Sequence, residues 1–308
     1  MNLSTILQAA FPKSVHRLNP QVELRNESFF LDNENHKHYQ KYGWCVLKNV
    51  VNDSEIKSFA DTFEEICELE RLSLDTNFMN TGCHVSSESR SKTQNIIRQN
   101  VKTILPRAFD MNKVETDTGG SYVVKPAHEK SDLATHQDSS FIDEDKDYTL
   151  FLWAPFCDIT ETNGPVWVLS GSHLWGNTQR GLCVPWNLNK HIPIMNKYMH
   201  PVLINKGDIL VFDPALVHGS GPNLSDKTRH AITISVLRKN SQLVFYYKNK
   251  ELSPDQLEKY YVNEQFFNEY DFSSKPDENK WKKEVIKHNS FDLSEKELIK
   301  IIEKYLPE

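Results

Sequence analysis

The stretch Thr135–Ser139, which reads Thr-His-Gln-Asp-Ser, constrains the fold of this chain more than any other. His136 and Asp138 are two residues apart, and in a β-strand such residues project from the same face. The stretch therefore predicts a strand that directs an imidazole and a carboxylate to one point. A matching third group is His218, which ends an apolar, strand-like run that reads Pro-Ala-Leu-Val-His. We expect the two stretches to meet at one site.

Two histidines and one carboxylate form the ligand set of non-haem Fe(II) oxygenases, in which positions on the metal stay open. The His-x-Asp pair alone is a weak signal, because it occurs by chance in many chains. We therefore predict His136, Asp138 and His218 as metal ligands on the strength of the residues that follow His218.

Arg229 follows His218 across a segment rich in Gly, Pro, Asn, Ser and Asp. Because this composition is typical of turns, we expect His218 and Arg229 on neighbouring antiparallel strands. On the second strand, Arg229, Ala231, Thr233 and Ser235 share one face, and branched apolar residues share the other. A guanidinium among small polar side chains predicts a pocket for a small anion, since it binds carboxylate bidentately. The alternative is a surface arginine beside a polar strand face.

Three motifs occur in order along the middle of the chain. They are His136-x-Asp138, then Asn163-Gly164-Pro165 leading to Ser170-Gly171-Ser172-His173, and then His218-Gly-Ser220-Gly-Pro-Asn ending at Arg229. Together they resemble the phytanoyl-CoA dioxygenase family of Fe(II)/2-oxoglutarate-dependent oxygenases, and the resemblance covers roughly Trp44 to Leu237.

The resemblance implies a mainly β fold with flanking helices, built on a double-stranded β-helix (a cupin-like jelly roll). It also implies that His136, Asp138 and His218 hold Fe(II), and that Ser220 and Arg229 hold the far carboxylate of 2-oxoglutarate, with O2 as the second co-substrate. Related halogenases replace the carboxylate ligand with a small residue. Asp138 therefore favours hydroxylation or another oxidation over halogenation.

The strand predicted over Gly120–Pro126 precedes the first ligand motif. Lys125 and Tyr122 lie on it and are candidates to contact the co-substrate or the substrate, since some related enzymes use a polar side chain there. Val123 and Val124 occupy much of this strand. The alternative for Lys125 is a solvated lysine at a strand end.

The 308 residues, 38% of them hydrophobic, predict a single domain. We expect an N-terminal arm over 1–42, the jelly-roll core with covering helices over 43–249, and a helical C-terminal extension over 250–308. A capping box at Ser294–Glu297 predicts the last helix, with one apolar face. That face comprises Leu298, Ile301, Ile302 and Tyr305.

Within the core, a helix is expected to begin at Asn52 or Asp53. Its apolar positions recur at helical spacing: Ile56, Phe59, Phe63 and Ile66. Polar composition predicts a substrate-facing loop over 76–92. A short helix is expected over 95–105.

Later in the core, the acidic segment Asp143–Asp147 is predicted to be a solvated turn, and 174–200 a lid-like connection. Val202–Ile204 and Ile209–Phe212 are expected to form a hairpin that leads to His218. His173 is the strongest competing ligand, but a histidine after a tight turn more often satisfies backbone groups.

The charge pattern argues against polymeric partners. The net charge of −6 arises from 36 basic and 42 acidic residues without long blocks of one sign, so neither nucleic acid nor a membrane is expected as a partner. Five cysteines without C-x-x-C spacing predict neither disulfides nor a zinc site. Together with the lack of a signal segment or of about 20 consecutive apolar residues, they favour a cytoplasmic protein.

The expected activity is oxidation of an unactivated C–H bond of a small molecule, with release of succinate and CO2. A small polar metabolite is the expected substrate, because no nucleotide-binding signature supports a CoA ester. Two alternatives are a non-oxidative metal-dependent isomerase or hydrolase on the same barrel and a non-catalytic binding module. The sequence does not specify an oligomeric state.

Overall fold

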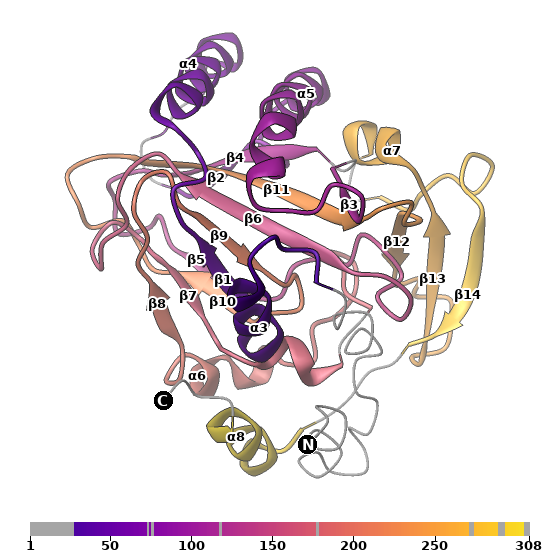
Figure 1. Cartoon of the computed structure of the whole chain (residues 1–308). Coiled ribbons are helices and arrows are strands. Elements are labelled where there is room, and N and C mark those ends of the chain that lie inside the picture. The colour runs from indigo at the N-terminus through magenta and orange to yellow at the C-terminus, as the bar shows by residue number, and fades with distance from the viewer. Residues whose placement is uncertain are drawn as a thin grey trace.

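The computed structural model describes residues 28–72, 74, 77–116, 119–176, 179–270, 274–288 and 293–304. Two antiparallel sheets form its centre, as expected of a double-stranded β-helix (Figure 1). Most of the predicted N-terminal arm lies outside these residues. Its last part forms α3 (Asn33–Tyr42).

The larger sheet has seven strands in the order β1-β9-β6-β11-β4-β2, with β3 paired to β11. Its strands are β1 (Trp44–Leu47), β2 (Met79–Asn80), β3 (Val114–Glu115), β4 (Gly120–Lys125), β6 (Thr149–Pro155), β9 (Ile209–Phe212) and β11 (Arg229–Arg238). The smaller sheet has the order β5-β10-β7-β8. Its strands are β5 (Leu133–His136), β7 (Val166–Val168), β8 (His200–Val202) and β10 (His218–Ser220). In the described part of the chain the two sheets do not close into a barrel.

Apolar side chains from both sheets meet between them. Leu210 and Ala231 of the larger sheet share one buried cluster with Val166 and Val168 of the smaller sheet. On β11 the residues between the inward-facing ones belong to a second cluster, on the outer face of the larger sheet. The two faces predicted for this strand are therefore confirmed.

Helices α4 (Asp53–Glu70) and α5 (Ser87–Ile104) cover that outer face (Figure 1). α4 begins where predicted, because the side chains of Asn52 and Glu55 accept each other's backbone N–H in a capping box. Its buried residues are the predicted four, Ile56, Phe59, Phe63 and Ile66. This helix supports the sheet and does not reach the site.

The loop predicted over 76–92 is wrong in its second half. α5 begins at Ser87 and is longer than the helix predicted over 95–105. The Ser86 side chain accepts the backbone N–H of Ser89, so polar residues that suggested a loop instead cap the helix and line its first turns.

Two predicted strand pairings are also wrong. β8 belongs to the smaller sheet and β9 to the larger one, so they do not form a hairpin. Likewise, β10 with His218 and β11 with Arg229 lie in different sheets. The turn-rich segment between them carries the chain from one sheet to the other. Turn composition marks a reversal of the chain but does not specify which strand pairs with the next.

The C-terminal extension is not purely helical. A third sheet consists of β12 (Val244–Tyr247), β13 (Gln256–Tyr261) and β14 (Lys283–Lys287), with α7 (Glu264–Glu269) after β13. The charged composition of this segment suggested a helix, but Glu258 and Lys259 are buried in β13. Their burial is possible because each is neutralised at 2.7 Å, Glu258 by Lys283 and Lys259 by Asp143. α8 (Glu295–Lys304) has the predicted capping box and the buried residues Leu298, Ile301 and Ile302; Tyr305 lies outside the described residues.

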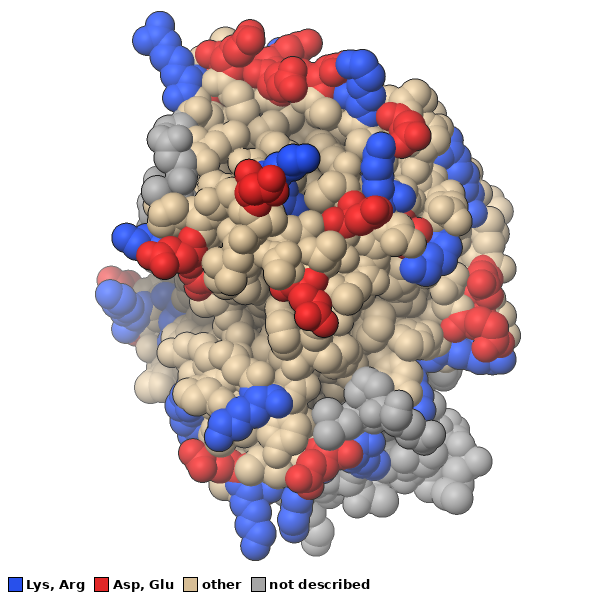
Figure 2. Space-filling view, turned by 90° about the vertical axis from the view of Figure 1, so that its left-hand side faces the viewer, with Lys and Arg blue, Asp and Glu red and all other residues tan. Residues whose placement is uncertain are grey.

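The remaining helical segments are short: α6 (Ile192–Met195) and single 3-10 turns at Leu105–Arg107, Ser172–Trp175 and Asn189–His191. Basic and acidic side chains are interspersed over the face in Figure 2, and neither sign forms a large patch there. Among the described helices, none combines the length and the hydropathy needed to cross a bilayer.

Candidate active site

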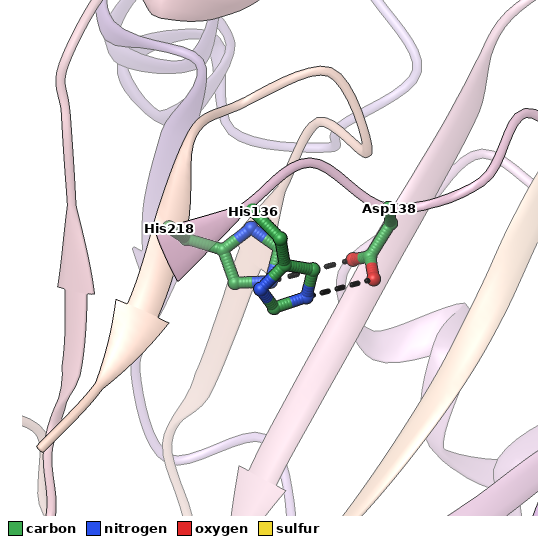
Figure 3. A group of neighbouring side chains, drawn as sticks. All are labelled: His136, Asp138 and His218. Atoms are coloured by element: carbon green, nitrogen blue, oxygen red, sulfur yellow. Dashed lines mark ion pairs between the residues drawn. The ribbon is translucent and has the colours of Figure 1, made fainter. Parts of the chain in front are cut away.

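His136, Asp138 and His218 lie together at one end of the smaller sheet (Figure 3). His136 ends β5 and is paired in register with His218, the first residue of β10. One carboxylate oxygen of Asp138 lies 3.5 Å from Nε2 of His136, and the other lies 3.5 Å from Nε2 of His218. A ligand atom from each residue lies within 4.8 Å of the other two, so the group could hold a metal ion.

Each imidazole is oriented by its own strand. Nδ1 of His136 lies 2.7 Å from the carbonyl oxygen of Ala134, and Nδ1 of His218 lies 2.9 Å from that of Leu216. A proton on Nδ1 donates to the carbonyl oxygen, which leaves the Nε2 lone pair free for a metal. The same arrangement directs both Nε2 atoms towards Asp138.

The electrostatics of the three groups suit a cation between them. Burial lowers the pKa of His218 to about 4, so this imidazole is neutral at neutral pH. Burial opposes the ionisation of Asp138, but His218 and His136 outweigh it and lower the pKa of this carboxyl. Burial also opposes a charge on His136, yet the Asp138 carboxylate raises its pKa. A metal ion could take the place of that proton.

A buried ion pair holds the main chain at Asp138. Arg180 donates from Nε to the carbonyl oxygen of Asp138 at 2.8 Å, and from Nη1 and Nη2 to the two carboxylate oxygens of Glu144 at 2.8 and 2.6 Å. The side chains of Arg180 and Glu144 are 4% and 1% exposed. The backbone N–H of Asp138 also donates to the carbonyl oxygen of Pro214. Both peptide groups of the carboxylate residue are thus anchored.

The sequence analysis missed this pair. Glu144 lies in the segment Asp143–Asp147, so the prediction of a merely solvated turn is wrong for this residue. Arg180 lies in the connection 174–200, where the predicted lid does contribute to the site. A single long-range pair leaves no periodic signal in the sequence that could have revealed it.

Two glycines of the motifs lie where neighbouring atoms approach closely. A Cβ on Gly219 would lie 3.1 Å from the carbonyl oxygen of Leu133 and 3.2 Å from the backbone nitrogen of Thr135, because β10 and β5 approach closely. Gly164 has φ +75°, and a Cβ there would lie 2.8 Å from Cδ of Lys125. Glycine at both positions lets the strands and Lys125 pack beside the three clustered residues.

Arg229 is buried in the same cavity, across from the smaller sheet. It is 2% exposed, and its guanidinium carbon lies 5.0 Å from the ring centre of Trp153. Its Nε and Nη1 atoms are buried without a hydrogen-bond partner, and within the described ranges no carboxylate pairs with it. Unpartnered guanidinium donors in an enclosed pocket are costly unless an anion occupies it. The alternative of a surface arginine is therefore wrong.

Lys125 is fully buried beside Arg229, so the alternative of a solvated lysine is also wrong. Its Nζ donates to the carbonyl oxygens of Ser131 at 2.6 Å, Ser220 at 3.1 Å and Gly221 at 2.7 Å. These bonds use all three donors of an ammonium group. Burial, with a contribution from Arg229, lowers the pKa of Lys125 to about 7.

Ser220 lines the cavity, and its hydroxyl donates to the carbonyl oxygen of Gly164 at 3.0 Å. Tyr122, in contrast, does not line the cavity. Its ring packs 5.0 Å from that of Phe63 on the outer face of the sheet, which contradicts the expectation that it contacts the co-substrate or substrate. On β4 the inward positions are those of Ser121, Val123 and Lys125.

The cavity has a volume of about 620 Å³ and contains the three clustered residues, Arg229, Ser220 and Lys125 in its lining. The first half of the predicted substrate-facing loop, from Phe78 to His84, also contributes to it. The C-terminal extension adds Phe267, a contribution that the sequence analysis missed. His173 lies elsewhere, with its ring 3.3 Å from the carbonyl oxygen of Gln40.

Comparisons with known sequences agree with this geometry. The sequence family described as Phytanoyl-CoA dioxygenase (PhyH) matches residues 39–231. The human protein "Phytanoyl-CoA dioxygenase, peroxisomal" is 28% identical over 261 residues, which are 74% of this chain and 73% of that protein. "Phytanoyl-CoA dioxygenase 1" of Oryza sativa subsp. japonica is 30% identical over 119 residues, 38% of this chain and 42% of that protein.

Among solved structures, the fold is similar to that of the non-heme alpha ketoglutarate dependent carbocyclase SnoK from nogalamycin biosynthesis. The TM-score is 0.51 at 19% sequence identity, over 73% of this chain and 92% of that one. This likeness supports the jelly-roll assignment.

Proposed function

The chain belongs to the phytanoyl-CoA dioxygenase family and is therefore an Fe(II)/2-oxoglutarate-dependent oxygenase, and we propose that it hydroxylates a C–H bond of a small molecule. The observation that carries the proposal is the position of Arg229. Its unpartnered donors lie in the same cavity as His136, Asp138 and His218. A metal site and an anion site within one cavity suit a co-substrate that carries a carboxylate at its far end.

In this proposal the Nε2 atoms of His136 and His218 and the carboxylate of Asp138 hold Fe(II). Bound iron with 2-oxoglutarate and O2 supplies the oxidising chemistry, and the co-substrate leaves as succinate and CO2. The chain supplies the ligand geometry, because the Ala134 and Leu216 carbonyl oxygens fix both imidazoles.

Arg229 and Ser220 are proposed to bind the far carboxylate of 2-oxoglutarate. The guanidinium has donors available, whereas the Ser220 hydroxyl must turn away from the Gly164 carbonyl oxygen to donate. Lys125 supports the pocket through its bonds to the main chain at Ser220 and Gly221. It contributes positive charge there without direct contact.

The anaerobic complex provides the test. Adding Fe(II) and then 2-oxoglutarate to the purified protein under anaerobic conditions should produce a weak metal-to-ligand charge-transfer band in the visible range. Asp138→Ala serves as the control variant and should not produce it. A non-oxidative isomerase or hydrolase would not show the band, and neither would a binding module. Its absence with metal and co-substrate in excess would refute the proposal.

The cytoplasmic location and the oxidation of a small molecule by hydroxylation, rather than by desaturation or ring formation, stay predictions. Product mass separates hydroxylation from the other two oxidations, since hydroxylation adds one oxygen atom whereas desaturation and ring formation each remove two hydrogen atoms.

A further inference from the structure

A continuous wall of phenylalanine rings leads away from the metal centre. Phe212 lies 4.8 Å from the ring centre of His218, and Phe151 lies 5.9 Å from that of Phe212. Phe141 then lies 5.7 Å from Phe151 and 5.1 Å from Phe267. All four side chains line the cavity, and we call them the phenylalanine wall. Each ring contacts the next, so the wall is one extended apolar surface.

The wall combines two parts of the chain that are distant in sequence. Phe212 and Phe151 lie on β9 and β6 of the larger sheet, whereas Phe267 lies on α7 of the C-terminal extension. Phe141 is the link between them, because its ring contacts both Phe151 and Phe267. The extension therefore helps to shape the part of the cavity that lies beyond the metal centre.

The charged groups of the cavity are all assigned to other tasks. Arg180 is neutralised by Glu144, and Lys125 donates to three carbonyl oxygens. Asp138 carries the single carboxylate among the described lining residues and belongs to the metal centre. Arg229 is taken by the co-substrate in the proposed function. A charged group on the part of a substrate that lies inside the cavity would therefore be buried without a counter-charge, which is strongly unfavourable.

From these two observations, and on the basis of the proposed function, we propose that the part of the substrate that enters the cavity is uncharged and that its extended apolar portion lies along the phenylalanine wall. A hydrocarbon or ring system next to Phe212 would present a C–H bond to the metal centre. The cavity volume of about 620 Å³ is in the range that holds a molecule of drug-like size. This proposal departs from the expectation of a small polar metabolite.

A matched pair of fluorescent probes tests the proposal. N-Phenyl-naphthylamine is an uncharged two-ring molecule, and anilinonaphthalene sulfonate is the same framework with one sulfonate. Both are titrated into the full-length protein loaded with Ni(II) and saturating 2-oxoglutarate, so that Arg229 is occupied. The uncharged probe should bind at least about 10-fold more tightly, because the sulfonate would lose its hydration without gaining a partner.

Variants locate the bound probe. Phe141→Ala should weaken binding of the uncharged probe by about 10-fold, and Phe141→Leu, which keeps apolar bulk, by less. Leu224→Ala is the control, since Leu224 is 66% exposed and lies outside the cavity lining. This variant should bind the uncharged probe with the affinity of the wild type. If Phe141→Ala does not fold, Phe267→Ala on the same wall takes its place, and an affinity equal to wild type in that variant overturns the proposal.

Binding of the sulfonated probe that is as tight as, or tighter than, that of the uncharged probe would also overturn the proposal. Failure of the proposed function is a separate result, because it shows in the binding of 2-oxoglutarate itself. A protein that binds 2-oxoglutarate normally but does not prefer the uncharged probe refutes the substrate class alone. A protein that never binds 2-oxoglutarate, even with Ni(II) bound, refutes the function instead.

Discussion

Replacing Arg229 by glutamine is the most informative single change, because it removes the charge of the proposed co-substrate pocket and leaves the three metal ligands in place. The guanidinium is 2% exposed, so its pairing with a carboxylate takes place out of solvent. Removing one member of such a buried charge pair costs about 2–5 kcal/mol of binding free energy. At about 1.4 kcal/mol per tenfold change, the Kd for 2-oxoglutarate should rise by about 30- to about 4,000-fold.

Ser220→Ala is the milder comparison. A single hydrogen bond contributes about 1 kcal/mol, which corresponds to about a 5-fold rise in the same Kd. Iron affinity should change much less in both variants, since neither residue is a proposed ligand. The assay consists of two titrations, one with the co-substrate and one with the metal. The charge-transfer band monitors binding of the co-substrate, and calorimetry measures both affinities.

Thermal unfolding adds an independent check on Arg229→Gln. Without an anion, wild-type Arg229 has buried donors that lack a partner, so the variant should unfold at the same temperature or higher. Saturation with 2-oxoglutarate at 100 times its Kd should stabilise the wild type by about 2.7 kcal/mol, and at the same concentration this gain should fall to about 0.9 kcal/mol or less in the variant. An unchanged 2-oxoglutarate dependence in a folded variant would refute the assignment of Arg229.

Three further changes test other parts of the site. Asp138→Ala should abolish turnover and weaken Fe(II) binding while circular dichroism shows a retained fold; normal turnover with iron bound would refute the ligand assignment. Glu144→Gln should lower the free energy of unfolding by about 3–5 kcal/mol in chemical denaturation, because Arg180 would keep an uncompensated buried charge, and Glu144→Leu with Arg180→Met should recover most of that loss. Lys125→Met should change the pH profile of stability. Burial lowers the pKa of Lys125 to about 7 in the folded protein, whereas the unfolded chain keeps a value of about 10.4, so between these values the unfolded chain binds more protons and wild-type stability should rise with pH. In chemical denaturation measured from about pH 7 to about pH 10, the free energy of unfolding of the variant should not show that rise. An identical slope of this free energy against pH in both proteins would contradict the lowered pKa of Lys125.

Features that depend on neighbours in the chain could be predicted from the sequence. The capping box at Asn52 and the apolar face of α4 follow from local helix patterns, and the structure contains both. The strand predicted to carry His136 and Asp138 is shorter than expected, since β5 ends at His136, although the two side chains do meet. The alternation along β11 was predictable for a similar reason, since Ile232, Ile234 and Val236 recur at every second position and all belong to the outer cluster.

The face of a strand that points inward was not always predictable. Period-two alternation separates Tyr122 from Lys125 but does not decide which one enters the cavity, because both have an apolar stem and a polar end. The packing of α4 decides it, since Phe63 takes up the Tyr122 ring on the outer face. Lys125 can then face inward because Gly164 leaves room for its stem and three carbonyl oxygens accept from its ammonium.

Partnerships between distant segments were determined only by the tertiary structure. The sequence placed His218 and Arg229 on adjacent strands, but the turn between them crosses from one sheet to the other, and the two residues therefore contribute to the cavity from different sheets. Turn residues favour a reversal through local backbone geometry, whereas the choice of the next strand's partner depends on which apolar faces are buried together. The pairing of Glu144 with Arg180 has the same origin, since an ion pair between separate segments imposes no period on either one.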